Sequence, residues 1–172
     1  MPVYQPPVLL EASLRQLRSY VYRFYPELEK SNGIPLDFWS LEDDELFLEI
    51  LSYMPLHISE EAQGQFEDWP TAFRLAFPIF WIEDDYEVNG WTALINAGED
   101  MLEAAITAYR RIGMTEEADA LAAALESIRH DPQNEDAAEQ AFKSVRNPYT
   151  DEEKKFRTLV KFFRDNETLW FE

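Results

Sequence analysis

The chain of 172 residues contains no cysteine, which excludes disulfide bonds, thiolate metal sites and a cysteine nucleophile. Its only two histidines, His57 and His130, do not form a ligand-spaced pair for a transition metal. Glycine is scarce as well, with five residues and no glycine-rich loop that could hold a phosphate. The sequence therefore predicts no cofactor and gives little support to an enzymatic activity.

Long hydrophobic runs are also missing. No stretch approaches the roughly 18 continuous apolar residues of a membrane span, and Glu11 and Arg15 interrupt the apolar run near the N-terminus, so no signal peptide is expected. The predicted location is the cytoplasm, without membrane contact. Hydrophobic residues still make up 46% of the chain and aromatic residues 15%, which predicts one domain over residues 1–172. The five tryptophans, including Trp69, Trp81 and Trp91, are expected in its core.

Apolar residues recur at helical spacing along most of the chain. A first helix is expected over residues 9–25, ending at Pro26. The stretch "SLEDDELFLEILSYM" predicts a second helix with Ser40 as its N-cap. The aromatic segment "PTAFRLAFPIFW" is apolar nearly all round and is expected to be buried, with a bend or an end at Pro78.

The second half of the chain has the clearest helical pattern. One helix is expected from Glu99 to a stop at Gly113, and another after a cap at Thr115. "NEDAAEQAFKSV" and a C-terminal segment capped by Thr150 supply two more. No segment alternates like a strand, so an all-α fold is predicted, as a single compact multi-helix domain of about seven or eight helices.

The negative charge is concentrated in one region. Residues 31–142 hold 25 Asp and Glu against four Arg, a net charge of −21, whereas the two ends together are slightly positive. Charge that served only solubility would be spread along the chain, so the segregation favours an acidic face that binds a partner, although solubility alone stays open. The predicted partner-binding carboxylates are Glu42, Asp43, Asp44, Glu45, Glu49, Glu60, Glu61, Glu67, Asp68, Glu83, Asp84, Asp85, Glu87, Glu99, Asp100, Glu116 and Glu117.

Helix capping could account for two or three of these acidic clusters, because carboxylates are favoured at helix N-termini. It does not readily account for the four consecutive acids of "EDDE" or for the four in "EDDYE". Such like charges repel one another in the free protein, and a cationic partner would relieve the repulsion.

The stretch "WIEDDYEVNGW" resembles a calcium loop at first sight, because Asp85, Glu87 and Asn89 alternate before Gly90. Position 12 of such a loop would be Asn96, which cannot supply the bidentate carboxylate that closes a calcium site. No metal site is predicted here. A carboxylate-based metal-binding protein or enzyme stays an alternative in a chain this acidic, although no pair of acids is singled out by an apolar setting that would raise one pKa.

A surface of this charge would repel DNA but suit a protein that binds DNA. Duplex DNA carries about one negative charge per 1.7 Å of its axis, and its partners present matching rows of Lys and Arg. Carboxylates one helical turn apart, about 5.4 Å along the axis, can imitate such an array. We therefore expect a basic DNA-binding protein as the partner and no direct contact with nucleic acid.

Residues 76–130 carry a family resemblance in four stretches: "FPIFWIEDDY", "EVNGW", "INAGEDMLEAAITAYRRIGM" and "EEADALAAAL". Through them the chain resembles the small acidic bacterial DNA-mimic proteins and a related domain family of unknown function. Relatives usually show an Asn-Gly-Gly-aromatic turn, whereas Asn89-Gly90 here runs straight into Trp91. The resemblance implies an all-helical, dimeric protein whose carboxylates occupy the DNA-binding surface of a helix-turn-helix transcription factor and so relieve repression.

Two further points stay open at this level. An immunity-type inhibitor of a basic nuclease toxin needs the same acidic face as a mimic directed at a transcription factor. The C-terminal stretch "KSVRNPYTDEEKKFRTLVKFFR" is locally basic and amphipathic, so it could pack against an acidic neighbour, pack against a second subunit, or stay solvated.

Overall fold

The computed structural model describes residues 14–15, 17, 21–23, 26, 37–56 and 66–171, apart from the side chains of residues 54–56 and 68. His57, Glu60 and Glu61 lie outside the described residues. In the described part every regular element is an α-helix or a short 3-10 helix, which confirms the all-α fold. No helix there combines the length and hydropathy needed to cross a lipid bilayer.

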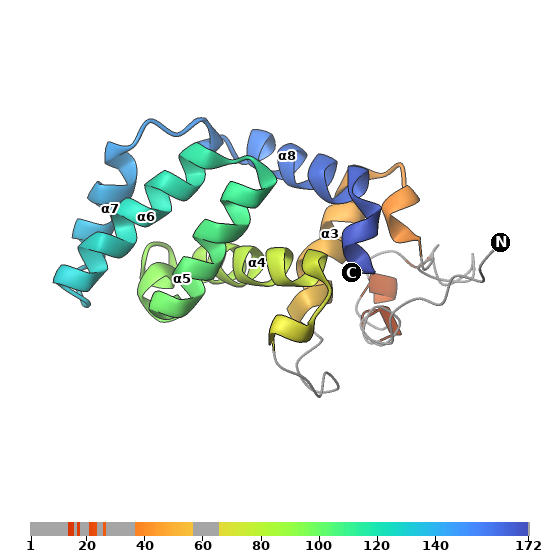
Figure 1. Ribbon diagram of the computed structural model, residues 1–172, viewed down its shortest axis with the longest axis horizontal. Coiled ribbons are helices and arrows are strands. Elements are labelled where there is room, and N and C mark those ends of the chain that lie inside the picture. Colours follow the sequence, from red (N-terminus) through yellow and green to blue (C-terminus); the bar gives the residue numbers. More distant parts are fainter. Residues whose placement is uncertain are drawn as a thin grey trace. The chain divides into compact units, whose positions relative to one another are not determined.

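From residue 71 onward the helices follow one another with short connections (Figure 1). The α-helices are α3 (Asp44–Leu56), α4 (Thr71–Asn89), α5 (Thr92–Ile112), α6 (Thr115–His130), α7 (Glu135–Ser144) and α8 (Glu152–Asp165). The 3-10 helices are η1 (Phe38–Ser40), η2 (Phe66–Asp68), η3 (Pro148–Thr150) and η4 (Glu167–Trp170). Backbone contacts divide the chain into two compact units, unit 1 (residues 1–74 and 160–172) and unit 2 (residues 75–159), each with a core of its own. One domain over residues 1–172 stays a prediction.

Unit 1 has an aromatic core around Trp170, which is fully buried. Its ring meets Phe38 edge-on at a centroid distance of 5.0 Å and Phe73 at 5.4 Å, and Phe38 stacks on Phe47 at 5.5 Å. Edge-on and offset rings of this kind are favourable beyond the area they bury. The core thus brings together residues that lie more than one hundred positions apart in the sequence.

The predicted first helix is described at only a few positions. Leu14, Leu17 and Val21 are helical and buried, as their shared helical face predicts. Pro26, the predicted end of that helix, is itself helical.

In unit 2, α5, α6 and α7 pack against one another (Figure 1). The α5–α6 connection is short because Gly113 ends α5 in the left-handed conformation, with φ 92° and ψ 13°. The facing sides of the two helices bury leucine, isoleucine and many alanines, and the small alanine side chains allow a close approach of the backbones. The predicted stop at Gly113 is confirmed.

Three predicted helix caps are wrong, each by one to three residues. Asp43 rather than Ser40 caps α3, because its side chain accepts from the first backbone amides while Ser40 belongs to η1. No side chain caps α6, and Thr115 is its first residue. Asp151 rather than Thr150 caps α8, accepting from the amide of the third helical residue at 3.1 Å.

Two residues, Pro78 and Gly98, bear on where the helices are continuous and where they break. Pro78 is buried inside α4, and the helix continues past it to Asn89 rather than ending there. The prolyl ring costs one backbone hydrogen bond, but the buried apolar residues on both sides of it hold the helix in place. Gly98, with φ 73° and ψ 168°, breaks the helical path within α5, so the continuous helix starts at Glu99 as predicted.

Candidate functional site

The structure explains the acidic cluster "EDDE" at the start of α3 by local geometry. The Asp43 carboxylate accepts from the backbone amides of Glu45 and Leu46, both at 3.0 Å. Asp44 pairs with Arg164 at 2.6 Å, and it lies with Glu45 in the first turn, where the helix dipole favours acids. Capping and the helix dipole thus account for three of the four acids, contrary to the prediction, whereas Glu42 precedes the helix and is not explained in this way. All four side chains remain exposed.

Other predicted acids of unit 1 are scattered. Glu67 is exposed in η2, and Glu49 is partly buried on α3. Asp68 closes η2, and its side chain is not described.

The cluster "EDDYE" has no such explanation, because it occupies the last two turns of α4. The C-terminal end of a helix carries a partial negative charge, which repels carboxylates. Asp85 accepts from Asn89 at 2.5 Å and from Asn96 at 2.9 Å. Gly90, with φ 58°, follows the last helical residue as a structural turn. The stretch that resembled a calcium loop is thus a helix and its end.

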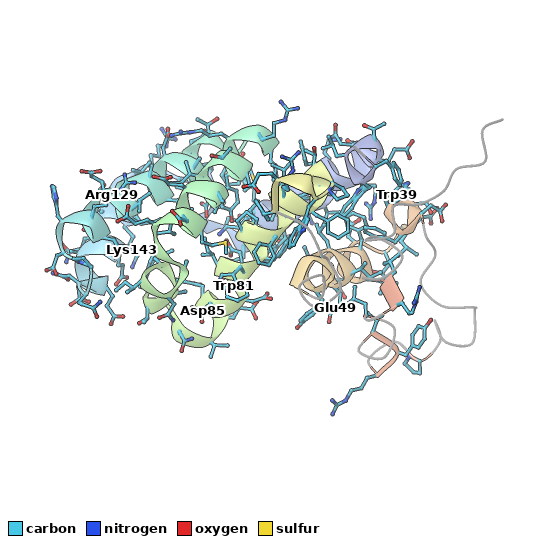
Figure 2. All side chains as sticks on the ribbon, turned by 60° about the horizontal axis from the view of Figure 1, so that its bottom comes forward. Trp39, Glu49, Trp81, Asp85, Arg129 and Lys143 are labelled. Carbon is cyan, nitrogen blue, oxygen red and sulfur yellow. The ribbon has the colours of Figure 1, made fainter. Side chains whose placement is uncertain are left out.

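One face of α4 combines acids with exposed apolar side chains. Trp81, Asp84, Asp85 and Val88 recur at helical spacing, and we call these four residues the α4 stripe. Trp81 is 46% exposed and Val88 is 81% exposed, while the two aspartates are partly exposed. Figure 2 shows Trp81 and Asp85 close together on this helix.

The expected burial of the tryptophans in the core is wrong for Trp81. Trp69 and Trp91 are only partly buried. The α4 segment is apolar nearly all round up to residue 80, but Trp81 falls on the face that carries the acids of the last two turns.

The opposite side of the same helix takes part in a buried ion-pair network. The Lys155 ammonium lies 2.9 Å from a carboxylate oxygen of Glu83 and 2.9 Å from one of Glu117. The Tyr109 hydroxyl donates to Glu83 at 2.7 Å, and Asn147 donates to Glu117. The exposed fractions of the three charged side chains are 12% for Lys155, 18% for Glu83 and 4% for Glu117.

Glu83 and Glu117 were both predicted to face a partner, but the structure turns both toward Lys155, with Glu117 buried and Glu83 partly buried. Helix α8 brings Lys155 against α4 and α6, so the two carboxylates turn toward it. Glu117 is buried and cannot present its charge to another protein. The basic C-terminal stretch thus packs, at Lys155, against an acidic neighbour within the chain.

The network shifts the titration of its members. Burial alone lowers the pKa of the Lys155 ammonium, but the charges of Glu83 and Glu117 and the hydrogen bonds to both outweigh burial and raise that pKa above its ordinary value. Burial first, and the same two carboxylates second, raise the pKa of the Tyr109 hydroxyl well above its ordinary value. Lys155 therefore stays charged and Tyr109 stays protonated through the neutral range.

A third group of acids surrounds Arg129 at the end of α6. Its guanidinium pairs with Glu99 at 2.9 Å and Glu103 at 2.5 Å on α5, and it approaches Glu126 at 3.9 Å. All four side chains are exposed, so the group has two more negative charges than positive ones at the surface. Glu99 was predicted to bind a partner, but its ion pair with Arg129 of the same chain was not predicted.

Several acids of unit 2 are exposed and make no ion pair within the described residues. Among the predicted residues these are Glu87 on α4, Asp100 on α5 and Glu116 on α6. Glu116 lies in the first turn of α6, where the helix dipole accounts for it, whereas Glu87 lies at the unfavourable end of α4. No three His, Cys, Asp or Glu side chains in the described part are grouped so that they could hold a metal ion.

The sequence could reveal the excess of acid but not which acids turn inward. Lys155 lies 72 residues from Glu83, and only the packing of the helices shows that the two meet. The amphipathic pattern of the segment around Lys155 was the available signal, because it indicates a helix with one packed face.

The fold and these surfaces define an all-helical protein whose charge is strongly negative and whose exposed apolar residues adjoin carboxylates. Residues 67–170 match the model of the family described as DMP19-like protein, which covers more than half of the chain, and the chain belongs to this family. No curated protein and no solved structure matches the chain.

Proposed function

We propose that this protein is a DNA mimic that binds the DNA-binding surface of a basic protein, a helix-turn-helix transcription factor. Its surface carboxylates take the place of phosphates, so the factor cannot bind its operator and repression is relieved. Membership of the DMP19-like family and the resemblance to acidic DNA-mimic proteins support this proposal. So does the net charge of −21 in residues 31–142, because rows of Lys and Arg on a DNA-binding surface attract such a region.

The observation that carries the proposal is the acidic end of α4. Carboxylates at a helix C-terminus raise the electrostatic energy of the free protein, and an approaching cationic surface lowers it. The exposed Trp81 and Val88 on the same face add apolar area that the aliphatic parts of Lys and Arg side chains can cover. Tryptophan is also among the residues that most often dominate the energy of protein interfaces.

Other exposed acids of unit 2 add to its negative surface charge. Asp100 and the carboxylates around Arg129 lie on α5 and α6, two helices that pack against each other. Neighbouring helices can align carboxylates in more than one row, and acids one turn apart are about 5.4 Å apart along each axis. Such rows match the chemistry of a phosphate backbone without its sequence information.

The test is affinity capture from a native extract at low salt with the full-length protein as bait and duplex DNA as the eluting competitor. We expect one basic DNA-binding protein to bind and to be released by DNA or by salt, because exposed charges are screened. Recovery of a nuclease instead would replace the transcription factor by a toxin as the target. Recovery of no basic protein would contradict the proposal.

A pair of variants locates the surface. Asp84→Asn with Glu87→Gln removes two charges at the end of α4. The control, Asp136→Asn with Glu153→Gln, also removes two negative charges from unit 2. These two acids lie in the first turns of α7 and α8, where the helix dipole accounts for their presence. We expect the first double variant to weaken capture by at least about tenfold and the second by less than about threefold. Both proteins should have the melting temperature of the wild type. Equal losses would show that only net charge matters.

A further inference from the structure

Unit 2 contains a cavity of about 220 Å³ next to the buried ion-pair network. Its walls include five aromatic side chains, from Tyr86, Trp91, Tyr109, Phe142 and Tyr149. Trp91 meets Tyr86 edge-on at a centroid distance of 5.3 Å and lies 5.1 Å from Phe142. These contacts fix the ring faces, so the cavity has a defined aromatic wall.

The charged side chains around the cavity do not balance. Three carboxylates line it, from Glu83, Glu117 and Glu152, and two ammonium groups, from Lys143 and Lys155. Glu152 and Lys143 are exposed, and Lys143 pairs with Glu139. In the part that is shielded from water, Glu83 and Glu117 share the single ammonium of Lys155, so one negative charge is left over. A negative charge in such a setting is costly unless a cation joins it.

The hydrogen bonds show which carboxylate oxygen of the network keeps unused acceptor capacity. Both oxygens of Glu117 are used, one by Lys155 and the other by Asn147. In Glu83 one oxygen, Oε1, takes both the Tyr109 hydroxyl and the Lys155 ammonium. The other oxygen, Oε2, accepts no hydrogen bond from the described residues. Glu83 lines the cavity, so the cavity has a carboxylate with one oxygen whose acceptor capacity the described residues do not use.

The aromatic wall already binds cations of the chain itself. The Lys143 ammonium stands 5.6 Å from the centroid of the Trp91 ring, and the Lys154 ammonium stands 5.4 Å from that of Tyr149. Both distances are within the range of cation–π attraction. Lys143 is 60% exposed and also pairs with Glu139, so it can leave the Trp91 face at little cost.

We propose that this cavity binds an organic cation, a guanidinium or primary ammonium group on a short aliphatic stem. The cationic head would donate to the free oxygen of Glu83 and meet the ring of Trp91, while the stem contacts the apolar wall. A hydrated metal ion does not fit aromatic walls, and an anion would meet a net negative charge. The inference is independent of the proposed function, since it concerns a cavity and not the acidic surface.

The direct test uses two probes of matched shape, n-butylguanidinium and the neutral n-butylurea, with the full-length protein. Binding is followed by the shift of the Trp91 indole N–H signal in a nitrogen–proton correlation spectrum. We expect the guanidinium probe to shift this signal in a saturable manner and to bind at least about tenfold more tightly than the urea. Equal binding of the two, or no binding of the guanidinium, would overturn the proposal.

Two variants with matched controls assign the site. Glu83→Gln removes the free carboxylate oxygen and is expected to weaken the guanidinium probe by about tenfold, whereas Glu87→Gln, one turn further along α4 and exposed, should leave it within about twofold. Lys143→Gln removes the ammonium that competes for the Trp91 ring and should strengthen binding of the guanidinium probe by about threefold or more. The control Arg157→Gln also breaks an exposed ion pair between residues four positions apart, and it should not strengthen binding.

These variants also separate a fold effect from a site effect. If Glu83→Gln does not fold, the Lys143→Gln comparison still decides, because Lys143 is exposed. An unchanged affinity in Lys143→Gln, or equal losses in Glu83→Gln and Glu87→Gln, would contradict the assignment. A blocked Gly-Arg-Gly peptide identifies the source of the cation. Binding at least as tight as that of the free probe would indicate a side chain of another protein, and weaker binding a free small molecule.

Discussion

Replacement of Lys155 by methionine removes the cation that two carboxylates share. Methionine keeps much of the aliphatic length of the lysine, so the change is mainly the loss of one charge. Lys155 is 12% exposed and Glu117 only 4%, so Glu117 would be left buried without its cation. Removal of one partner from a buried ion pair costs about 3–5 kcal/mol, and the greater exposure of Glu83, at 18%, places our expectation near the lower end, at about 3 kcal/mol.

Urea unfolding at pH 7, followed by far-ultraviolet circular dichroism, measures this loss in the full-length protein. Domains of this size have a free energy of unfolding of about 5–15 kcal/mol, so a loss of about 3 kcal/mol moves the midpoint clearly. Arg157→Met is the matched control on the same helix, because Arg157 is 74% exposed and, among the described residues, pairs only with the exposed Glu153. An exposed pair of this kind contributes less than about 1 kcal/mol.

A double variant separates lost charge from lost packing. Glu117→Gln in the Lys155→Met background removes one of the two uncompensated carboxylates and should recover part of the stability, since an uncharged amide is far less costly to bury than a lone charge. A loss below about 1 kcal/mol in the single variant, or no recovery in the double one, would refute the reasoning that this network is buried and electrostatically coupled.

Three other perturbations follow from the structure. The free energy of unfolding should fall as pH rises above about 10, because the raised pKa values of Lys155 and Tyr109 keep protons in the folded state that the unfolded chain releases. Equal free energies of unfolding in urea at pH 9 and pH 11 would contradict this. Gly98→Ala should destabilise by about 1–3 kcal/mol although a Cβ meets no atom within 4 Å, because its φ of 73° is strained for other residues; thermal melting at wild-type temperature would contradict this. Arg129→Gln should strengthen capture of the basic partner severalfold by freeing the carboxylates it pairs, and weaker capture would count against their role.

Much of the fold could be predicted because helical periodicity is a local property of the sequence. The faces of α3 and α5 that bury Leu46, Phe47 and Leu102 repeat at helical spacing, and Gly113 supplies a clear stop. Helix starts were less predictable, since Ser, Thr and Asp compete for the same role within a few residues. The cap is decided by which backbone amides point at each side chain, and Asp43 took the place expected for Ser40.

The candidate site was predictable in composition but not in orientation. The excess of acid between residues 31 and 142 is visible in the sequence, and it predicts an interaction surface of one sign. Whether a carboxylate faces solvent depends on cations far away in the chain, and Lys155 turns Glu83 and Glu117 inward. The exposure of Trp81 was not predictable either, because a tryptophan next to an apolar helix face is ordinarily buried. Only the packing of the helices shows that this one faces solvent.

The most direct test of the proposed function is a displacement measurement with the DNA-binding protein recovered by capture. That protein is first bound to its own labelled duplex, the present protein is added, and the fluorescence anisotropy of the duplex is followed at low and at high salt. The account predicts that the duplex is released at low salt, that high salt reduces the release, and that the Asp84→Asn, Glu87→Gln variant releases much less. A duplex that stays bound at every concentration of the acidic protein would contradict DNA mimicry.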